Sequence, residues 1–312
     1  MSSENSEAPT PFVLARATVE SVERLSPSFV RVTFVGPDLA DVGTLGHVLD
    51  QRIKLIFPTA AGELPDIAGR GADWYQAWLA LPEETRGSMR TYSIRELVVG
   101  EGITKLVIDF VLHLEPGFSG PASLWASAAQ AGDELLIVAP RRGFIDGVGI
   151  EYAPGDARSI LLAGDETAAP AIARILEDAH PGTKGIAFIE VPHTDDTLSI
   201  AAPRGVELRW LPREGGLHGE KLLPAVLDYL GTTSEGPISD TGTEDLLWET
   251  PTFSGLGETI SEATAPAERY FWIAGESGVV TTLRRHLVKD LGIDRFQVAF
   301  MGYWRKGVAM RG

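Results

Sequence analysis

Four segments of this chain combine residue types that suit electron transfer through a bound planar cofactor. The first is the run from Arg90 to Arg95 (RTYSIR), in which guanidinium groups, a ring and a hydroxyl alternate along an expected strand. Such a strand can place the ring of Tyr92 against a flavin, the hydroxyl of Ser93 near the flavin edge and a cation on a phosphate. The same alternation also fits an ordinary half-exposed strand.

The second segment is a strand with polar side chains followed by a helix start. Asp109 and His113 lie on the expected strand, and Gly120 and Pro121 open the helix that carries Trp125. A helix that starts with Gly-Pro presents free amides and a dipole that suit a pyrophosphate. His113 as a hydrogen-bonded barrel histidine and Trp125 as a core residue are the alternatives.

The third segment is a pair of similar strand–turn–helix patterns. LLAGDETAAP contains the turn at Gly164, and FWIAGESG contains the turn at Gly275. Ligands of α/β sheets bind at the carboxyl ends of strands, so the two turns are expected to line one crevice. The fourth segment is AFMGYWRKG, whose aromatic pair precedes Arg305 and Lys306. These residues suit a cover over a flavin that faces an anionic ligand, or else a solvated basic chain end.

The first half of the chain is predicted to form an antiparallel barrel. Short β-branched and aromatic runs are separated by Gly, Pro and Asp, which is typical of such folds. The six expected strands are Thr18–Arg24, Phe29–Val35, Arg52–Phe57, Arg90–Leu97, Lys105–His113 and Glu134–Ala139. A helix is expected at Ala122–Ala129, and Asp73–Leu81 has helical spacing that favours core or lid packing.

The second half alternates buried strands with helices, which predicts a parallel sheet covered on both faces. The expected strands are Ser159–Ala163, Gly185–Val191, Val206–Leu211, Tyr270–Ala274 and Gln297–Met301, and the expected helices are Ala171–Ala179, Lys221–Leu230 and Val279–Leu291. The boundary falls near Tyr152–Arg158, giving domains at 12–153 and 156–312. Residues 1–11 read as a disordered tail and 231–268 as an acidic, flexible insertion.

Composition excludes several classes of protein. The net charge of −16 argues against nucleic acid as a partner, and zero cysteines exclude disulfides, thiolate metal sites and Cys-ligated iron–sulfur clusters. The histidines have no metal-ligand spacing, so no metal site is expected. No apolar run reaches the ~20 residues of a membrane span, and no secretory signal is evident. The lack of a signal predicts a cytoplasmic protein, and the lack of an evident exposed apolar stripe predicts a monomer.

The order of these segments resembles the siderophore-interacting protein family, the FAD-dependent ferric-siderophore reductases of the ferredoxin-reductase superfamily. The resemblance runs from Phe12 to Gly307 through RTYSIR, IDFVLH, GPASLWA, LLAGDETAAPAI and AFMGYWRKG. It implies an FAD-binding barrel and an NAD(P)H-binding parallel-sheet domain. The link from His113 to Gly120 is longer than is usual in the family, and the acidic insertion is particular to this chain.

The resemblance also implies roles for individual residues. The residues implied to bind FAD are Arg90, Thr91, Tyr92, Ser93, Asp109, Val111, His113, Pro121, Ala122, Ser123 and Trp125. Those implied to border the nicotinamide nucleotide are Gly164, Asp165, Glu166, Thr167, Ala168, Arg213, Gly275 and Glu276. Lys54 and Lys306, with Arg305 and Arg142 as weaker candidates, would hold a ferric siderophore of the catecholate or hydroxamate type. The flavin itself would carry the redox chemistry, so no catalytic side chain is expected.

The choice of coenzyme stays open at this point. Arg213 or Arg174 would suit the 2′-phosphate of NADPH, whereas Glu190 at the end of its strand would suit a ribose hydroxyl of NADH. Two other functions also fit the sequence: a general NAD(P)H:flavin or ferredoxin-type reductase, and a non-catalytic siderophore-binding flavoprotein.

Overall fold

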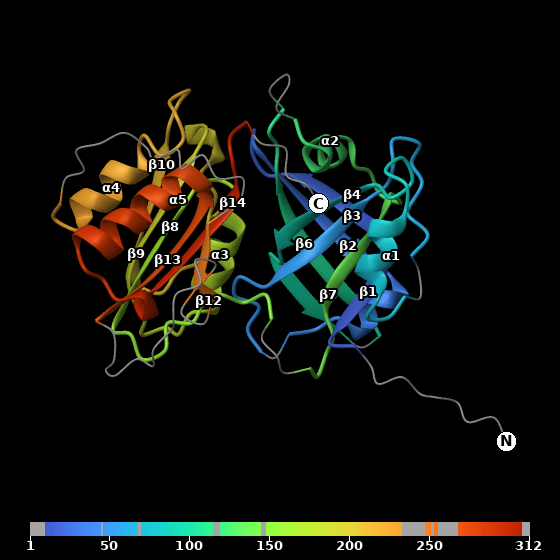
Figure 1. Ribbon diagram of the computed structural model, residues 1–312, viewed down its shortest axis with the longest axis horizontal. Coiled ribbons are helices and arrows are strands. Elements are labelled where there is room, and N and C mark those ends of the chain that lie inside the picture. Colours follow the sequence, from blue (N-terminus) through green and yellow to red (C-terminus); the bar gives the residue numbers. More distant parts are fainter. Residues whose placement is uncertain are drawn as a thin grey trace.

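The computed structural model describes residues 10–44, 46–67, 70–100, 102–114, 119–144, 148–232, 247–250, 253–254 and 268–307. Most of the expected tail and most of the expected acidic insertion lie outside the described residues. The described chain forms two seven-stranded sheets that lie next to each other, with helix α3 on the side of the second sheet that faces the first (Figure 1).

The first sheet is antiparallel and curls into a half-barrel, which confirms the barrel predicted for the N-terminal half. Its strands pair in the order β4-β3-β7-β1-β2-β6-β5. They are β1 (Phe12–Arg24), β2 (Phe29–Val35), β3 (Arg52–Phe57), β4 (Ser88–Ser93), β5 (Glu96–Val99), β6 (Thr104–Val111) and β7 (Glu134–Pro140). Apolar side chains on the inner face, Phe34, Leu55 and Phe110 among them, are fully buried and form its core.

The single strand predicted over Arg90–Leu97 is wrong, and the sheet has seven described strands rather than six. The chain breaks between β4 and β5, where Ile94 donates its amide to the carbonyl of Gln51 and Arg95 donates to that of Val107. Consecutive residues thus bond to opposite edges of the sheet. The break is needed because one straight strand cannot serve both edges.

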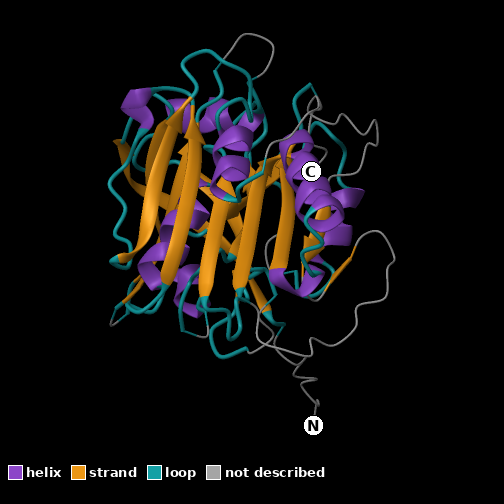
Figure 2. Ribbon diagram, turned by 90° about the vertical axis from the view of Figure 1, so that its left-hand side faces the viewer, coloured by secondary structure: helices purple, strands orange, loops and turns teal. Residues whose placement is uncertain are grey.

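The second sheet contains the parallel strands expected for the C-terminal half. Its order is β10-β9-β8-β13-β14-β11-β12, and the first five strands are parallel (Figure 2). They are β8 (Ser159–Gly164), β9 (Lys184–Val191), β10 (Gly205–Pro212), β13 (Arg269–Glu276) and β14 (Val298–Trp304). The short antiparallel strands β11 (Trp248–Thr250) and β12 (Phe253–Ser254) fall inside the range expected to be an insertion, and β11 pairs with β14.

Five α-helices accompany these sheets in the described residues. They are α1 (Trp74–Ala80), α2 (Pro121–Ala128), α3 (Ala169–Asp178), α4 (Leu222–Tyr229) and α5 (Ser277–Arg284). Short segments are η1 (Pro37–Asp41), η2 (Thr194–Asp196), η3 (Arg285–Asp290) and η4 (Arg295–Gln297), of which η3 continues α5 as a π-helical turn. None of the described helices is long and apolar enough to cross a membrane.

One apolar cluster belongs to both sheets. Phe29 and Val111 of the half-barrel are buried in the same cluster as Ile172 of α3 and Trp272 of β13. Because burial of apolar area is the main force that holds such surfaces together, this cluster joins the two sheets into one unit.

Buried carboxylates add polar ties across the same boundary. Asp196 of η2 accepts hydrogen bonds from the hydroxyls of Ser26 (2.7 Å) and Ser28 (2.9 Å), which lie before β2. Asp50, which precedes β3, accepts one from the indole nitrogen of Trp272 (2.9 Å). Both carboxylates are fully buried, so these bonds satisfy groups that water cannot reach.

Candidate functional site

The two Ala-Gly turns lie side by side at the carboxyl edge of the parallel sheet. Gly164 at the end of β8 is in register with Ala274 of β13. Asp165 Oδ2 then accepts a hydrogen bond from the amide of Glu276 at 2.7 Å. A Cβ on Gly275, whose φ is +136°, would lie 2.6 Å from the same oxygen, so only glycine allows this approach.

Asp165 and Glu276 organise the turns themselves. Asp165 Oδ1 accepts from the amide (2.9 Å) and hydroxyl (2.5 Å) of Thr167, and Oδ2 accepts from the indole of Trp304 at 2.9 Å. Glu276 caps α5 by accepting from the amides of Gly278 and Val279. Burial and the charge of Glu166 raise the pKa of Asp165. The turns are therefore held rigidly next to the end of β14.

Glu166 is the centre of a buried ionic cluster. Arg213, at the end of β10, donates to both Glu166 oxygens at 2.7 and 2.6 Å. His113 Nε2 lies 3.0 Å and His218 Nε2 3.4 Å from Glu166 Oε1. Burial alone would raise the pKa of Glu166, but the hydrogen bonds from Arg213 and His113, together with the nearby His218 ring, hold that pKa well below its usual range.

His113 brings the half-barrel into this cluster. It lies just beyond β6, and its ring centroid is 5.4 Å from that of Trp304, whose other neighbour is His218 at 4.7 Å. Burial of the His113 ring disfavours its charged form, but its bond to ionised Glu166 and the charge of Asp165 prevail, and its pKa is raised. The FAD candidate His113 and the nucleotide candidate Glu166 therefore contact each other directly.

The first four residues of the RTYSIR segment, Arg90 to Ser93, lie on the edge strand β4 of the half-barrel. Tyr92 packs on Phe110 with ring centroids 4.7 Å apart, and Thr91 accepts a hydrogen bond from Lys54 Nζ at 2.7 Å. The half-buried guanidinium of Arg90 donates to the carbonyl of Met89, and no carboxylate among the described residues lies within ion-pair distance of it. Backbone groups of an edge strand that point away from its neighbour, here β3, are open to a ligand.

Helix α2 begins at Pro121, with Gly120 as its N-cap, in agreement with the expected Gly-Pro start. The hydroxyl of Ser123 donates to the carbonyl of Val111 and accepts from the amide of His113, both at 2.9 Å, so it fastens α2 to the end of β6. Ala122 is buried. Trp125 is partly buried and packs against Phe34, Phe57 and Phe110 of the half-barrel core.

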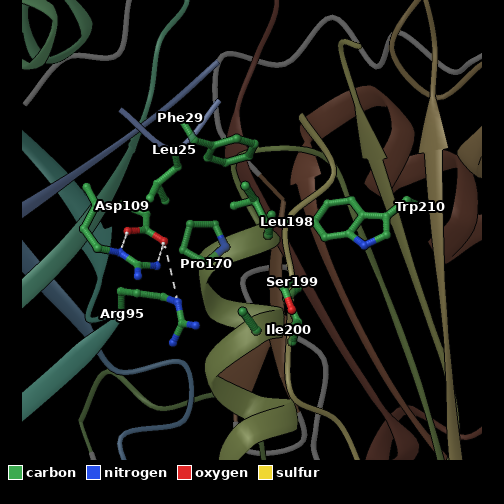
Figure 3. Close-up of a pocket in the computed structure, with 12 residues that line it drawn as sticks. Leu25, Phe29, Arg95, Asp109, Pro170, Leu198, Ser199, Ile200 and Trp210 are labelled. Carbon is green, nitrogen blue, oxygen red and sulfur yellow. Dashed lines mark hydrogen bonds and ion pairs between the residues drawn. The ribbon is translucent and has the colours of Figure 1, made fainter. Parts of the chain in front are cut away.

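Asp109 lies on the outer face of β6, in a cavity of about 150 Å³ between the half-barrel and α3 (Figure 3). Arg31 binds both of its oxygens, at 2.7 and 2.8 Å, and Arg95 lies 3.6 Å away. Arg95 in turn binds both oxygens of Glu177 on α3 at 2.6 Å. The carboxylate of Asp109 therefore belongs to an ionic network that links the two sheets.

The three residues considered for coenzyme choice, Glu190, Arg174 and Arg213, all have hydrogen-bond or ion-pair partners within the chain. Glu190, fully buried, accepts hydrogen bonds from the amides of Gly219, Lys221 and Leu222 at the start of α4. Arg174 pairs with Asp178 within α3. Arg213 is bound by Glu166, as described above.

The siderophore candidates lie in two places. Lys54 is on β3. Partial loss of hydration and the charge of Arg52 lower the pKa of its ammonium group. Arg305 and Lys306 follow β14, where the amide of Lys306 donates to Glu276 Oε1 at 3.3 Å. Arg142 is instead bonded to the carbonyl of Val42 and the hydroxyl of Thr104.

Sequence reasoning missed the contact that joins β3 to β14. The Arg52 guanidinium carbon lies 4.2 Å from the ring centre of Trp248 on β11, and Trp248 stacks on Tyr303 at 6.1 Å. Arg52 Nε and the Tyr303 hydroxyl are buried without a hydrogen-bond partner among the described residues. The polar composition around Trp248 gave no signal for this contact, although a lone Trp in such a stretch is unusual.

Family models match both halves of the chain. Residues 18–144 match the siderophore-interacting FAD-binding domain, and residues 157–307 match the siderophore-interacting protein model. The chain belongs to the siderophore-interacting protein family. FAD is therefore its cofactor.

Several relatives match nearly the whole chain. An uncharacterized Mycobacterium tuberculosis protein is 31% identical over 93% of this chain and 89% of its own length. Ferric vibriobactin reductase ViuB of Vibrio cholerae is 28% identical over 91% and 86%. The NADPH-dependent ferric-chelate reductase of Escherichia coli is 27% identical over 92% and 91%.

Solved structures with the same fold also cover nearly the whole of this chain. A siderophore utilization protein from T. fusca superposes with a TM-score of 0.68 at 28% identity, covering 97% of this chain and 96% of that one. The ferredoxin reductase of carbazole 1,9a-dioxygenase has a TM-score of 0.55 at 16% identity, covering 94% and 68%. The fold is therefore that of the ferredoxin reductases.

Proposed function

We propose that this protein is a ferric-siderophore reductase that moves electrons from NAD(P)H through FAD to iron in the cytoplasm. The observation that carries the proposal is the contact of His113 with Glu166 and Trp304. It joins the end of β6, next to the phosphate-suited helix α2, to the carboxyl edge of the parallel sheet. A cofactor held on the first element would adjoin a nucleotide held on the second.

The residues present fit FAD. Arg90, with no carboxylate partner among the described residues, would bind phosphate, and the open edge of β4 beside Tyr92 would receive the planar ring. When bound, FAD accepts the two electrons of a hydride and passes them on singly, as Fe(III) requires.

The side chains of the protein would bind and orient the nicotinamide nucleotide and the ferric siderophore. Asp165 and Glu276 fix the two turns that would border the nicotinamide nucleotide. Lys54 and Lys306, on elements connected through Arg52, Trp248 and Tyr303, would attract an anionic ferric siderophore to an otherwise acidic protein. One NAD(P)H reduces two Fe(III) to two Fe(II) and releases one proton. Relatives named as ferric reductases support this substrate class.

Anaerobic stopped-flow absorbance tests the proposal on the FAD-loaded protein. We expect NAD(P)H to bleach the flavin bands and a ferric siderophore to restore them, with Fe(II) captured by a ferrous chelator. Restoration by free flavin or ferredoxin but not by a ferric siderophore would indicate a general reductase. Bleaching by neither coenzyme would indicate a non-catalytic flavoprotein.

A further inference from the structure

The carboxyl ends of β9 and β10 lie at the side of the sheet where the adenosine half of a coenzyme is expected, an expectation that rests on the proposed function. Nucleotides lie across the carboxyl ends of parallel strands, and their pyrophosphate favours the start of the first helix, here α3. β9 and β10 are the outer strands on one side of β8. Their terminal turns therefore decide how the adenosine ribose is recognised.

The described basic side chains at these two turns each have a carboxylate oxygen within 4.0 Å. Arg213 donates to both oxygens of Glu166 and also to His218 Nε2, at 2.9 Å. The same His218 nitrogen lies 3.4 Å from Glu166 Oε1. His193 Nδ1 lies 3.6 Å from Glu214, and Lys221 Nζ lies 4.0 Å from Glu220. A 2′-phosphate would meet no uncompensated cation among them.

Glu214 is a carboxylate that is held in place by both turns and is accessible to solvent. Its Oε1 accepts hydrogen bonds from the amide (2.8 Å) and hydroxyl (2.7 Å) of Thr194, which follows β9. Its own amide donates to the carbonyl of Pro192 at 2.9 Å, and its backbone adopts a left-handed φ of +47°. The side chain remains 56% exposed, so the carboxylate is fixed in place without being covered.

We propose that Glu214 makes the protein selective for NADH over NADPH. The carboxylate would accept a hydrogen bond from a ribose hydroxyl, whereas the phosphate of NADPH would bring a second negative charge to the same place. His193, 3.6 Å from Glu214, can carry at most one positive charge, which is less than the combined negative charge of the carboxylate and the phosphate. The chain would thereby differ from its relative named for NADPH.

Titration calorimetry with 5′-ADP and 2′,5′-ADP on the FAD-loaded protein tests the assignment apart from catalysis. We expect 5′-ADP to bind at least about tenfold more tightly, the ratio that corresponds to about 1.4 kcal/mol. NADH should bleach the flavin faster than NADPH at equal concentration. Equal binding, tighter binding of 2′,5′-ADP, or no binding of either nucleotide would overturn the assignment.

Two matched variants locate the effect. Glu214→Gln removes the charge and keeps an oxygen for Thr194, so the preference for 5′-ADP should shrink severalfold. Glu207→Gln makes the same charge change on β10, at an exposed carboxylate bound to Arg209, and should leave the preference unchanged. Equal effects of the two variants would contradict a local role for Glu214. Failure of both coenzymes to bleach the flavin is a separate outcome, which contradicts the proposed function itself.

Discussion

His113 Nε2 lies 3.0 Å from Glu166 Oε1, so the half-barrel and the parallel sheet share an ionic contact at the proposed site. Glu166 is ionised at neutral pH because Arg213 and the imidazoles hold its pKa low. An ionised carboxylate only accepts hydrogen bonds, and His113 Nε2 must therefore carry a proton. Protonation at Nδ1 as well would convert the contact into a salt bridge.

This contact predicts a pH-dependent contribution to stability. The pKa of His113 is raised in the folded protein, so its stabilisation is fully present below the unfolded value of about 6.5 and is lost as pH rises through the higher folded pKa. Relative to His113→Gln, the wild type should lose stability over that window. The ring is 32% exposed, so we expect a loss of only about 0.5–1 kcal/mol. Parallel pH profiles of denaturant unfolding for the two proteins would contradict this.

Gly275→Ala should destabilise the crevice between the two turns. The added Cβ would overlap Asp165 Oδ2 and adopt an unfavourable φ, and we expect a cost of about 2 kcal/mol or more. The control is Gly62→Ala, where φ is +82° and a Cβ meets no atom within 4 Å, so only the backbone cost of about 1–2 kcal/mol should appear. Urea unfolding measures both. A cost at Gly275 no larger than at Gly62 would show that Asp165 moves aside easily.

Replacing Lys54 and Lys306 together by Ala should weaken ferric-siderophore binding while leaving the FAD content unchanged. Loss of two charges should raise KM for an anionic ferric catecholate by about tenfold, and by less for an uncharged ferric hydroxamate, because the attraction is Coulombic. Lys184→Ala, at the exposed start of β9, is the control. Reduction kinetics at low and high salt provide the readout, and unaltered KM in the double variant would exclude these lysines as the docking site.

Asp196→Asn should loosen the tie between the two sheets. The amide nitrogen of Asn cannot accept the bonds that Ser26 and Ser28 donate, so a buried donor is left without a partner. We expect a loss of about 1–3 kcal/mol, compared with almost none for Asp195→Asn at the exposed neighbouring position. Thermal unfolding, followed by calorimetry and by flavin and tryptophan fluorescence, measures the loss. Identical midpoints for the two variants would argue that the apolar cluster alone joins the sheets.

Much of the fold could be predicted because its signals are local. The alternation of apolar strands with helices in the second half required only hydrophobic runs and turns, and the paired turns at Gly164 and Gly275 did come together. The break between β4 and β5 could not be predicted, since it depends on which edges Ile94 and Arg95 reach. Strand β11 was missed because three residues in a polar stretch acquire their strand character from β14.

The site was harder to predict because its side chains bind partners that are distant in the sequence. Arg213 and Glu190 were read as residues that contact the coenzyme, yet the first is bound to Glu166 and the second to the start of α4. Asp109 is likewise engaged by Arg31. A sequence records that a charge is present, but the distance to its counter-ion follows only from the packed structure.

The apolar cluster that contains Phe29, Val111 and Trp272 bears on how this chain can be recombined with its relatives. Cutting the chain near residue 155 would expose these apolar side chains to water. Neither fragment is therefore expected to fold stably on its own. Chimaeras that exchange one half for that of a homologue would need compatible surfaces on both sides of the cut. The most useful crossover points are therefore those that keep Ser26, Ser28 and Asp196 from the same parent.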